Sequence, residues 1–262
     1  MKNTKKKYFH INSLDKGTKV IELLADKGEL SVTKVAEHLG LNRTGSHRFL
    51  ATLRELGYVE KNKDSRYQLT FKILELGMKM ANRFEIRREA RPYMQELSLA
   101  FRETVNLGIR EELEILHLDK IDSLEILRMD SPVGSRAPAY CTALGKANLA
   151  FLPEKELDDL LNGVKLKPYG PNTITSKKML RKELEKIRNQ GYAVDNEELA
   201  YGLRCVAAPI FDHTGLPRYS ISVAGPAMRL TEKRVQQIQK TIRKFCNELS
   251  RRLGEPGKAS SI

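Results

Sequence analysis

Long hydrophobic runs, paired cysteines and the features of a signal peptide are all missing from this sequence. No apolar stretch approaches the roughly 18 residues that a membrane-spanning helix needs, so nothing indicates a membrane protein. The three cysteines, Cys141, Cys205 and Cys246, are odd in number and form no CxxC pair, which argues against a disulfide framework and a thiolate zinc site. The basic start MKNTKKKYFHI has no apolar core or cleavage site, and we therefore expect a cytoplasmic protein. We expect no metal and no cofactor.

Acidic residues are too few to balance the basic ones. The 262 residues carry 46 Lys and Arg against 33 Asp and Glu, and the net charge of +13 favours an anionic partner such as nucleic acid or an acidic membrane surface. The excess is denser at the N-terminal end, where the first 80 residues hold 16 basic and 9 acidic side chains. Charge alone does not distinguish these partners. The length predicts two domains, each able to bury its own core.

Two short helices joined at a glycine are predicted near the N-terminus. Apolar residues repeat at helical spacing over about 14–26, then from residue 32 to Gly40 and again from residue 43 to Gly57. Ser31 and Asn42 stand where the N-caps of the second and third helices belong. Because only two residues separate the second helix from the Asn42 cap, the arrangement is typical of a helix-turn-helix.

A hairpin and two longer helices follow. Residues 58–60 and 66–69 are predicted as strands around a polar turn, and this hairpin would be the wing. Residues 71–84 and 87–102 have helical patterns. An apolar stripe on the first of these can pack on its own domain or on a partner chain, and consists of Ile73, Leu76, Met80 and Ala81. We predict a homodimer through these helices, and hence a palindromic operator on double-stranded DNA.

From residue 104 onwards, strands alternate with helices. The predicted strands cover 105–109, 113–120, 125–129, 192–194, 204–211 and 219–224, and the predicted helices 143–151, 154–161, 177–190 and 232–253. This order predicts an α/β domain built on a mainly antiparallel sheet. The whole chain is then α+β: a flexible basic arm (1–12), a winged helix-turn-helix (13–70), a helical linker (71–86), a C-terminal α/β domain (87–254) and a flexible tail (255–262).

The start of the third helix carries the residues that we expect to contact DNA. A recognition helix enters the major groove with its N-terminal side chains against the base edges. Arg43 and Arg48 can bind guanine in a bidentate manner or clamp phosphates. Gly45 costs about 1 kcal/mol against Ala inside a helix, which indicates a close approach there, although a solvated face with one tolerated glycine is the alternative. With the wing, the predicted contacts are Asn42, Arg43, Thr44, Ser46, His47, Arg48, Lys61, Lys63 and Arg66.

Two further segments could carry chemistry. Cys205 as a nucleophile needs a base such as His117 or His213, but no local motif supports a Cys–His enzyme, and a buried inert thiol is the simpler interpretation. Residues 143–147 resemble a phosphate-binding loop but fail its pattern, because Tyr140 replaces the first glycine and the Ser or Thr that binds magnesium is missing. What remains is Thr142 as an N-cap followed by free backbone N–H groups, which can hold a carboxylate or merely cap a helix.

Several motifs, in order, resemble the IclR family of transcription regulators over about 14–253. They are SLDKGTKVIELLAD, VTKVAEHLGLNRTGSHRFLATLRELGYVE, YQLTFKILELG, TALGKANLA, DNEELAYGLRCVAAPIFD and SISVAGPAMRLT. The resemblance implies a winged helix-turn-helix, a helical linker used in dimerisation and a GAF-like effector domain. It further implies dimers that often pair into tetramers, and no enzymatic activity.

The resemblance also implies a cavity for a small organic acid, which is the second expected partner. Its lining would be the backbone N–H donors of Ala143 and Leu144 together with Asp195, Leu203, Cys205, Ser222 and Ala224. An apolar wall would come from Ile126, Met129 and Ala137. Some members carry a second serine where this chain has Ala224, so one hydroxyl contact is absent here.

Within the family, the segments LDKIDS, LRMDSPVGSRAPAY, NTITS and DNEELAYGLRC resemble the KdgR-type subgroup. That resemblance implies a regulator of pectin and uronate catabolism that responds to 2-keto-3-deoxygluconate. We therefore predict a sequence-specific DNA-binding regulator, a repressor of a carbon-catabolism operon, that responds to a small organic or sugar acid. An enzyme acting on such an acid through Cys205 and a basic protein binding DNA without sequence preference remain as alternatives.

Overall fold

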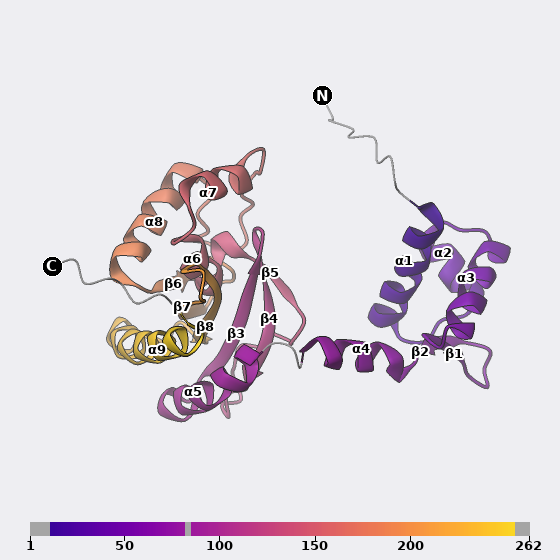
Figure 1. Cartoon of the computed structure of the whole chain (residues 1–262), viewed down its shortest axis with the longest axis horizontal. Helices are drawn as coiled ribbons and strands as arrows, with labels where there is room; N and C mark the ends of the chain where they lie inside the picture. Colours follow the sequence, from indigo (N-terminus) through magenta and orange to yellow (C-terminus); the bar gives the residue numbers. More distant parts are fainter. Residues whose placement is uncertain (1–10, 82–84, 255–262) are drawn as a thin grey trace. The chain divides into compact units, whose positions relative to one another are not determined.

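The computed structural model describes residues 11–81 and 85–254, and the chain divides into two compact units between residues 84 and 85 (Figure 1). The predicted tail and most of the predicted basic arm lie outside the described residues, although Asn12 already opens the first helix. The predicted linker over 71–86 includes one helix of the first unit and the first two residues of a helix that belongs to the second unit. Each unit is described separately below.

The first unit contains the predicted helix-turn-helix and wing. Its elements are α1 (Asn12–Lys27), α2 (Val32–Leu39), α3 (Arg43–Glu55), β1 (Val59–Lys61), β2 (Tyr67–Leu69) and α4 (Phe71–Ala81). α2 begins after Ser31, whose Oγ accepts a hydrogen bond from the Lys34 N–H, and ends at Gly40, whose φ of 60° suits a residue without a side chain. The caps are local features, which is why the sequence predicted these helix boundaries so closely.

A small core holds this unit together. The side chains that pack in it come from α1, α2, α3 and the hairpin: Val20, Leu24, Val35, Leu50, Leu53, Val59 and Tyr67. Burying a Val or Leu side chain completely contributes about 1.5–3 kcal/mol, so this cluster is the main source of stability in the unit. The hairpin is antiparallel, with Glu60 opposite Gln68, and Leu30 adds a bridge to Tyr67.

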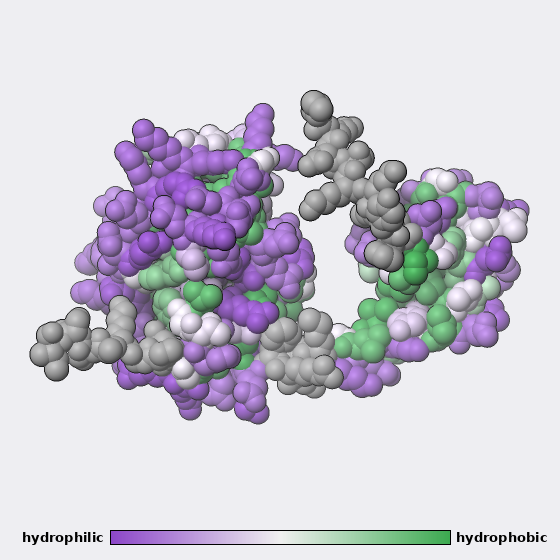
Figure 2. All heavy atoms as spheres, turned by 45° about the horizontal axis from the view of Figure 1, so that its top comes forward, coloured by the Kyte–Doolittle hydropathy of each residue, from purple (hydrophilic) through white to green (hydrophobic). Residues whose placement is uncertain are grey.

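α4 leaves much of its apolar surface exposed. Phe71, Leu74 and Met78 are spaced three and four residues apart, so they lie on one side of the helix, and each is at least 48% exposed. In the predicted stripe, Leu76 is exposed and Ile73 half-buried, whereas the side chains of Met80 and Ala81 lie outside the described part of the chain. Figure 2 shows hydrophobic atoms at the surface of this unit.

The second unit is built on one six-stranded sheet with the order β5-β4-β3-β8-β7-β6, antiparallel at every pairing. The predicted antiparallel α/β domain is therefore confirmed. In Figure 1, α5 and α9 lie on one side of the sheet, and α6, α7 and α8 on the other. The elements are α5 (Glu85–Phe101), β3 (Thr104–Glu111), β4 (Glu114–Ile121), β5 (Arg136–Pro138), a 3-10 turn η1 (Ala139–Cys141), α6 (Ala143–Leu149), α7 (Glu154–Leu161), α8 (Lys177–Gln190), β6 (Ala193–Asn196), β7 (Leu203–Phe211), β8 (Pro217–Pro226) and α9 (Glu232–Arg252).

The predicted strand over 125–129 is wrong. These residues belong to a loop after β4, whereas β4 pairs with the short strand β5, which the pattern did not predict. Side chains from elsewhere hold the loop: Thr104 Oγ1 donates to the Met129 carbonyl at 3.0 Å, and Arg229 donates to the Leu127 carbonyl at 2.8 Å. Arg229 itself forms a bidentate ion pair with the buried Glu103 carboxylate. The apolar residues Ile126, Leu127 and Met129 therefore suggested a strand in a segment that long-range contacts hold as a loop.

Candidate functional site

The first turns of α3 present a basic, polar surface. The side chains of Arg43, Thr44, His47 and Arg48 are all exposed. Within the described part of the chain, neither arginine has an acidic partner. Many arginines of the second unit, by contrast, are held in ion pairs, such as Arg229 with Glu103. Unpaired guanidinium groups at a helix N-terminus can bind a nucleic acid without first breaking an internal contact.

Ser46 is not part of that surface, so its prediction as a DNA contact is wrong. Its side chain is fully buried, and its N–H donates to the Asn42 carbonyl as part of the helix. Ser46 lies three residues after Arg43 and four before Leu50, which is itself buried. Residues 42–48 are nearly all polar, so the sequence does not show which of them faces the core. Helical periodicity turns one of them, Ser46, to the side of Leu50.

The glycine of α3 has a structural explanation. Asn42 caps the helix, and its Oδ1 accepts a hydrogen bond from the Gly45 N–H at 2.7 Å. A Cβ at position 45 would lie 2.9 Å from that same oxygen. The close approach that the glycine indicated therefore comes from the cap, and the carbonyl oxygen of the Asn42 side chain is already in use.

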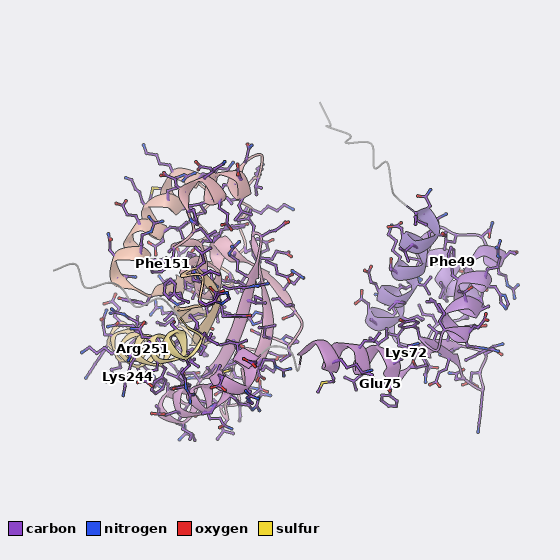
Figure 3. The ribbon with its side chains drawn as sticks, in the orientation of Figure 1. Phe49, Lys72, Glu75, Phe151, Lys244 and Arg251 are labelled. Carbon is purple, nitrogen blue, oxygen red and sulfur yellow. The ribbon has the colours of Figure 1, made fainter. Side chains whose placement is uncertain are left out.

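The wing residues Lys61, Lys63 and Arg66 are exposed, as expected for phosphate contacts. Asn62 shapes the wing tip, because its Oδ1 accepts from two backbone N–H groups, those of Asp64 and Arg66, both at 3.0 Å. The start of α4 is anchored to the same unit by Lys72 (Figure 3), which donates to the Leu56 carbonyl at 2.6 Å and lies 4.5 Å from the centre of the Tyr58 ring.

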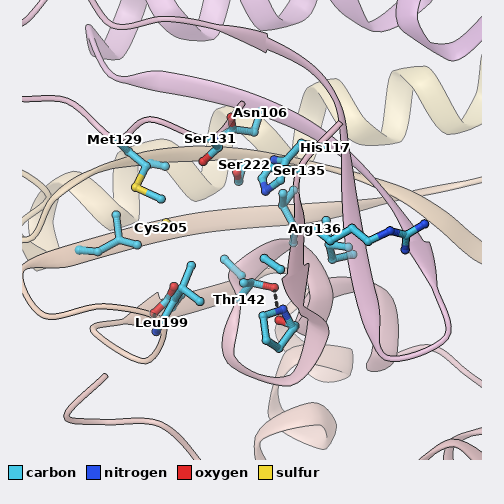
Figure 4. A pocket seen from close by; sticks show the side chains of 18 of the residues that line it. Asn106, His117, Met129, Ser131, Ser135, Arg136, Thr142, Leu199, Cys205 and Ser222 are labelled. Carbon is cyan, nitrogen blue, oxygen red and sulfur yellow. Dashed lines mark hydrogen bonds between the residues drawn. The ribbon is translucent and has the colours of Figure 1, made fainter. Parts of the chain in front are cut away.

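In the second unit, a cavity of about 300 Å³ lies between the sheet and the first turn of α6 (Figure 4). That volume is at the lower end of the range of small-molecule sites, about 300–1,000 Å³. Nine of the ten residues predicted for the effector line it: Met129, Ala137, Ala143, Leu144, Asp195, Leu203, Cys205, Ser222 and Ala224.

Strand register explains how residues far apart in sequence meet on one wall. Asp195 of β6 lies opposite Cys205 of β7, and Cys205 lies opposite Ala224 of β8. Because side chains alternate along a strand, Ser222 shares the face of Ala224, and Asn106 of β3 lies opposite Ser222. One face of four neighbouring strands thus supplies this wall.

The opposite wall is the start of α6. Thr142 caps the helix by accepting from the Gly145 N–H at 3.2 Å, so the N–H groups of Ala143 and Leu144 have no carbonyl earlier in the helix to bind. A Cβ on Gly145 would lie 2.1 Å from the Ala139 carbonyl oxygen. Only glycine therefore allows α6 to pack so closely on η1.

Asp195 is the most perturbed acid of the cavity. Its side chain is almost fully buried, and burial raises the pKa of its carboxyl from 3.8 to about 7. Oδ1 accepts from the Glu198 N–H at 2.8 Å, whereas the buried Oδ2 has no partner among the described residues. A carboxyl with this pKa exists in both protonation states near neutral pH, so it can either donate a hydrogen bond to a ligand oxygen or accept one from a hydroxyl.

A buried ion pair lies next to the cavity. Lys146 of α6 has no exposed surface, and its Nζ donates to the Val194 carbonyl at 2.7 Å and to the Glu198 carboxylate. Since the Glu198 N–H also donates to Asp195, Lys146 ties α6 to the segment that carries Asp195. The sequence analysis missed this role, although a lysine inside the apolar run of α6 was a visible signal.

Ile126 is not part of the apolar wall, so this prediction is wrong. Its side chain is 99% exposed and lies outside the cavity lining. The loop contacts at Leu127 and Met129 turn Met129 toward the cavity and leave Ile126 outside.

The cavity also has polar residues that the sequence analysis did not assign to effector binding. Asn106, His117 and Ser131 line it, together with Arg136 at its β5 edge and Tyr169. Asn106 and His117 could have been found, because each is a polar residue inside a predicted strand otherwise rich in buried apolar positions.

The cysteines do not form a nucleophilic site. All three are buried free thiols, and burial raises the pKa of Cys205 well above its usual value and that of Cys141 to about 12. The thiolate is the reactive form, so these groups are poor nucleophiles at neutral pH. His213, one of the bases considered, is exposed on the turn before β8 and does not line the cavity.

Comparison with known proteins agrees with this arrangement. The IclR helix-turn-helix domain matches residues 13–63, and the C-terminal domain of the bacterial transcriptional regulator IclR matches residues 78–251. The chain belongs to the IclR family. Its relatives include the HTH-type transcriptional regulator KdgR of Escherichia coli, 36% identical over 93% of each chain.

Solved structures give the same result. The IclR protein of Thermotoga maritima is 38% identical, with a TM-score of 0.80 over 94% of this chain and 100% of that one. The C-terminal domain of E. coli KdgR is 36% identical, with a TM-score of 0.60 over 65% of this chain and 99% of that one. This IclR-family chain is therefore a DNA-binding transcription regulator with a C-terminal effector-binding domain. Regulators of this kind are not enzymes, and no described helix is long and apolar enough to cross a membrane.

Proposed function

We propose that this IclR-family protein is a repressor of a carbon-catabolism operon, and that a small sugar acid such as 2-keto-3-deoxygluconate changes its affinity for the operator. The observation that carries the proposal is the cavity beside α6, in which Asp195 keeps a buried carboxylate oxygen without a partner among the described residues. A buried polar atom in a native protein normally has a hydrogen-bond partner. The hydroxyl of a bound ligand would supply it.

Within that cavity we place the ligand carboxylate at the N–H groups of Ala143 and Leu144 and at the Ser222 hydroxyl. These groups favour an anion without a buried cation, and at least one ligand hydroxyl then faces Asp195 and Cys205. Ala224 adds no hydroxyl. Because a carboxylate directly beside an ionised Asp195 would be repelled, this arrangement favours a hydroxylated acid over a short one such as pyruvate.

For the DNA-binding unit, we propose that α3 enters the major groove and that Arg43, Thr44, His47 and Arg48 face the bases or the phosphates. Lys61, Lys63 and Arg66 of the wing would contact the backbone of the same DNA. The exposed face of α4, with Phe71, Leu74 and Met78, supports a homodimer, because exposed apolar side chains on one side of a helix are costly in water. A twofold dimer binds a palindromic operator, and pairs of dimers would give tetramers.

One experiment tests the two halves of the proposal together. The DNA upstream of the candidate carbon-catabolism operon is footprinted with the wild type and with the Arg43→Ala, Arg48→Ala double variant. Each protein is tested with and without 2-keto-3-deoxygluconate. We expect the wild type to protect a palindromic site whose occupancy changes with the acid, and the variant to lose protection. An exposed pair of lysines in the second unit is the control, Lys182→Ala with Lys186→Ala on α8.

Full protection by the double variant would show that α3 is not the recognition helix. Protection that no sugar acid alters would contradict the effector class and leave the DNA-binding assignment intact. Light scattering at micromolar concentration completes the test, since a monomer would contradict the dimer.

A further inference from the structure

The side of the cavity away from Asp195 carries polar groups that the proposed function has not used. Asn106 of β3 and His117 of β4 lie on neighbouring strands and both line the cavity. In Figure 4 their side chains lie close to those of Ser131 and Ser222, whereas Cys205 and Leu199 lie in another part of the cavity. Asn106 is 2% exposed and His117 is 8% exposed, so both side chains are removed from water.

Both residues keep a hydrogen-bonding atom unsatisfied. Asn106 Oδ1 and His117 Nδ1 are buried and have no partner among the described residues. Two such atoms on adjacent strands of one cavity wall are unusual, because buried polar side-chain atoms are almost always paired. Asp195 Oδ2 repeats the pattern on the other side of the same cavity.

The charge state of this side limits what it can bind. Burial, and next the nearby Lys120 charge, lower the pKa of His117, so its ring is neutral at pH 7 and offers one donor and one acceptor. Arg136, which lines the cavity, is paired with Glu111 and Glu114, and Lys120, which acts on His117, is paired with Asp122 and Asp130. Asp130, which also lines the cavity, adds negative charge there.

We propose that Asn106 and His117 form a hydroxyl-binding subsite, which makes the cavity select polyhydroxylated acids over acids with a bare or a charged tail. Neutral amide and imidazole groups both donate and accept, which matches a hydroxyl, whereas a second carboxylate would find no unpaired cation among the described residues that line the cavity. The subsite deepens the proposed function and rests on it. Asn106 and His117 would bind the remaining hydroxyls of the tail, in addition to the hydroxyl that faces Asp195.

Three six-carbon 2-oxo acids separate the possibilities, because they share the head group and differ only in the tail. 2-Keto-3-deoxygluconate has a hydroxylated tail, 2-oxohexanoate a bare one and 2-oxoadipate a carboxylate. Calorimetry on the full-length protein should show the first binding tightest, by about tenfold or more, which corresponds to one or two hydrogen bonds lost to the bare tail.

The variants locate that preference. Asn106→Leu and His117→Phe keep the approximate shape but remove the hydrogen bonds, so each should weaken 2-keto-3-deoxygluconate about tenfold and leave 2-oxohexanoate unchanged or tighter. His117→Gln keeps a donor and an acceptor and should retain the preference, and it also serves if His117→Phe does not fold. His213→Phe makes the same exchange at an exposed histidine outside the cavity and should change neither ligand.

Each contrary result has a distinct meaning. If Asn106→Leu and His117→Phe weaken both ligands equally, the two residues only support the fold, and the subsite is wrong. If the wild type binds 2-oxohexanoate or 2-oxoadipate as tightly as the hydroxylated acid, the subsite is also wrong, although the acid-binding cavity stands. If the wild type binds none of the three, the effector class of the proposed function fails, and the subsite fails with it.

Discussion

Replacing Asp195 by asparagine removes the charge that burial penalises and keeps nearly the same side-chain shape. The amide oxygen can still accept from the Glu198 N–H, which Oδ1 of Asp195 accepts at 2.8 Å. The pKa of Asp195 rises from 3.8 to about 7 because burial disfavours the ionised form. Between pH 3.8 and about 7, the carboxyl of Asp195 keeps its proton in the folded chain and loses it in the unfolded chain. The contribution of Asp195 to the free energy of unfolding therefore falls as the pH rises through this range and is constant above it.

The pKa values give the size of the effect. The rise in the pKa of Asp195 to about 7 lowers the free energy of unfolding by about 4 kcal/mol once both states are ionised. Near pH 5, where only the unfolded carboxyl is ionised, the loss is about 1–2 kcal/mol. Asp195→Asn avoids this cost. We expect the variant to exceed the wild type in stability by about 1–2 kcal/mol near pH 5 and by about 4 kcal/mol near pH 8.

Urea unfolding followed by circular dichroism measures this difference at a series of pH values, and titration of other groups cancels between the two proteins. Asp119→Asn is the matched control, because Asp119 is also buried but binds Arg91 at 2.8 and 3.0 Å, so its replacement should bring no gain. A difference that stays constant with pH, or a variant less stable than the wild type near pH 8, would refute the reasoning. A stabilised variant that no longer binds its effector would show that Asp195 is kept for function at the expense of stability.

Two other substitutions test the framework of the cavity. Gly145→Ala places a methyl group 2.1 Å from the Ala139 carbonyl oxygen, so we expect it to lower the stability measured by thermal unfolding by about 1–3 kcal/mol. Gly77→Ala in α4 is the control, because a Cβ there meets nothing within 4 Å, and it should be neutral or stabilising; equal effects of the two variants would contradict the argument. Lys146→Met leaves the Glu198 carboxylate buried without its cation and should lower the free energy of unfolding by about 3–5 kcal/mol. Adding Glu198→Gln should recover part of that stability. If urea unfolding shows no recovery, the ion pair is not the cause of the loss.

Much of the DNA-binding unit could be predicted from the sequence, because its signals are local. The Ser31 and Asn42 caps and the left-handed Gly40 act within a few residues of the chain, and each marks a helix boundary where the structure has it. Helical spacing also identified most of the core. It failed at Ser46, where one polar residue of a polar run turns inward and only the packing of three helices decides which.

In the effector domain, the sequence indicated most of the helices and strands but not β5, and its motifs indicated the family and most of the cavity lining. It could not determine that residues 125–129 form a loop, since that depends on contacts with Thr104 and Arg229. Nor could it show that Asp195 titrates near neutral pH, or that Asn106 and His117 face the same cavity. Burial and register depend on strands that are far apart in the chain and meet only in the folded sheet, so the chemistry of these side chains was decided by the tertiary structure alone.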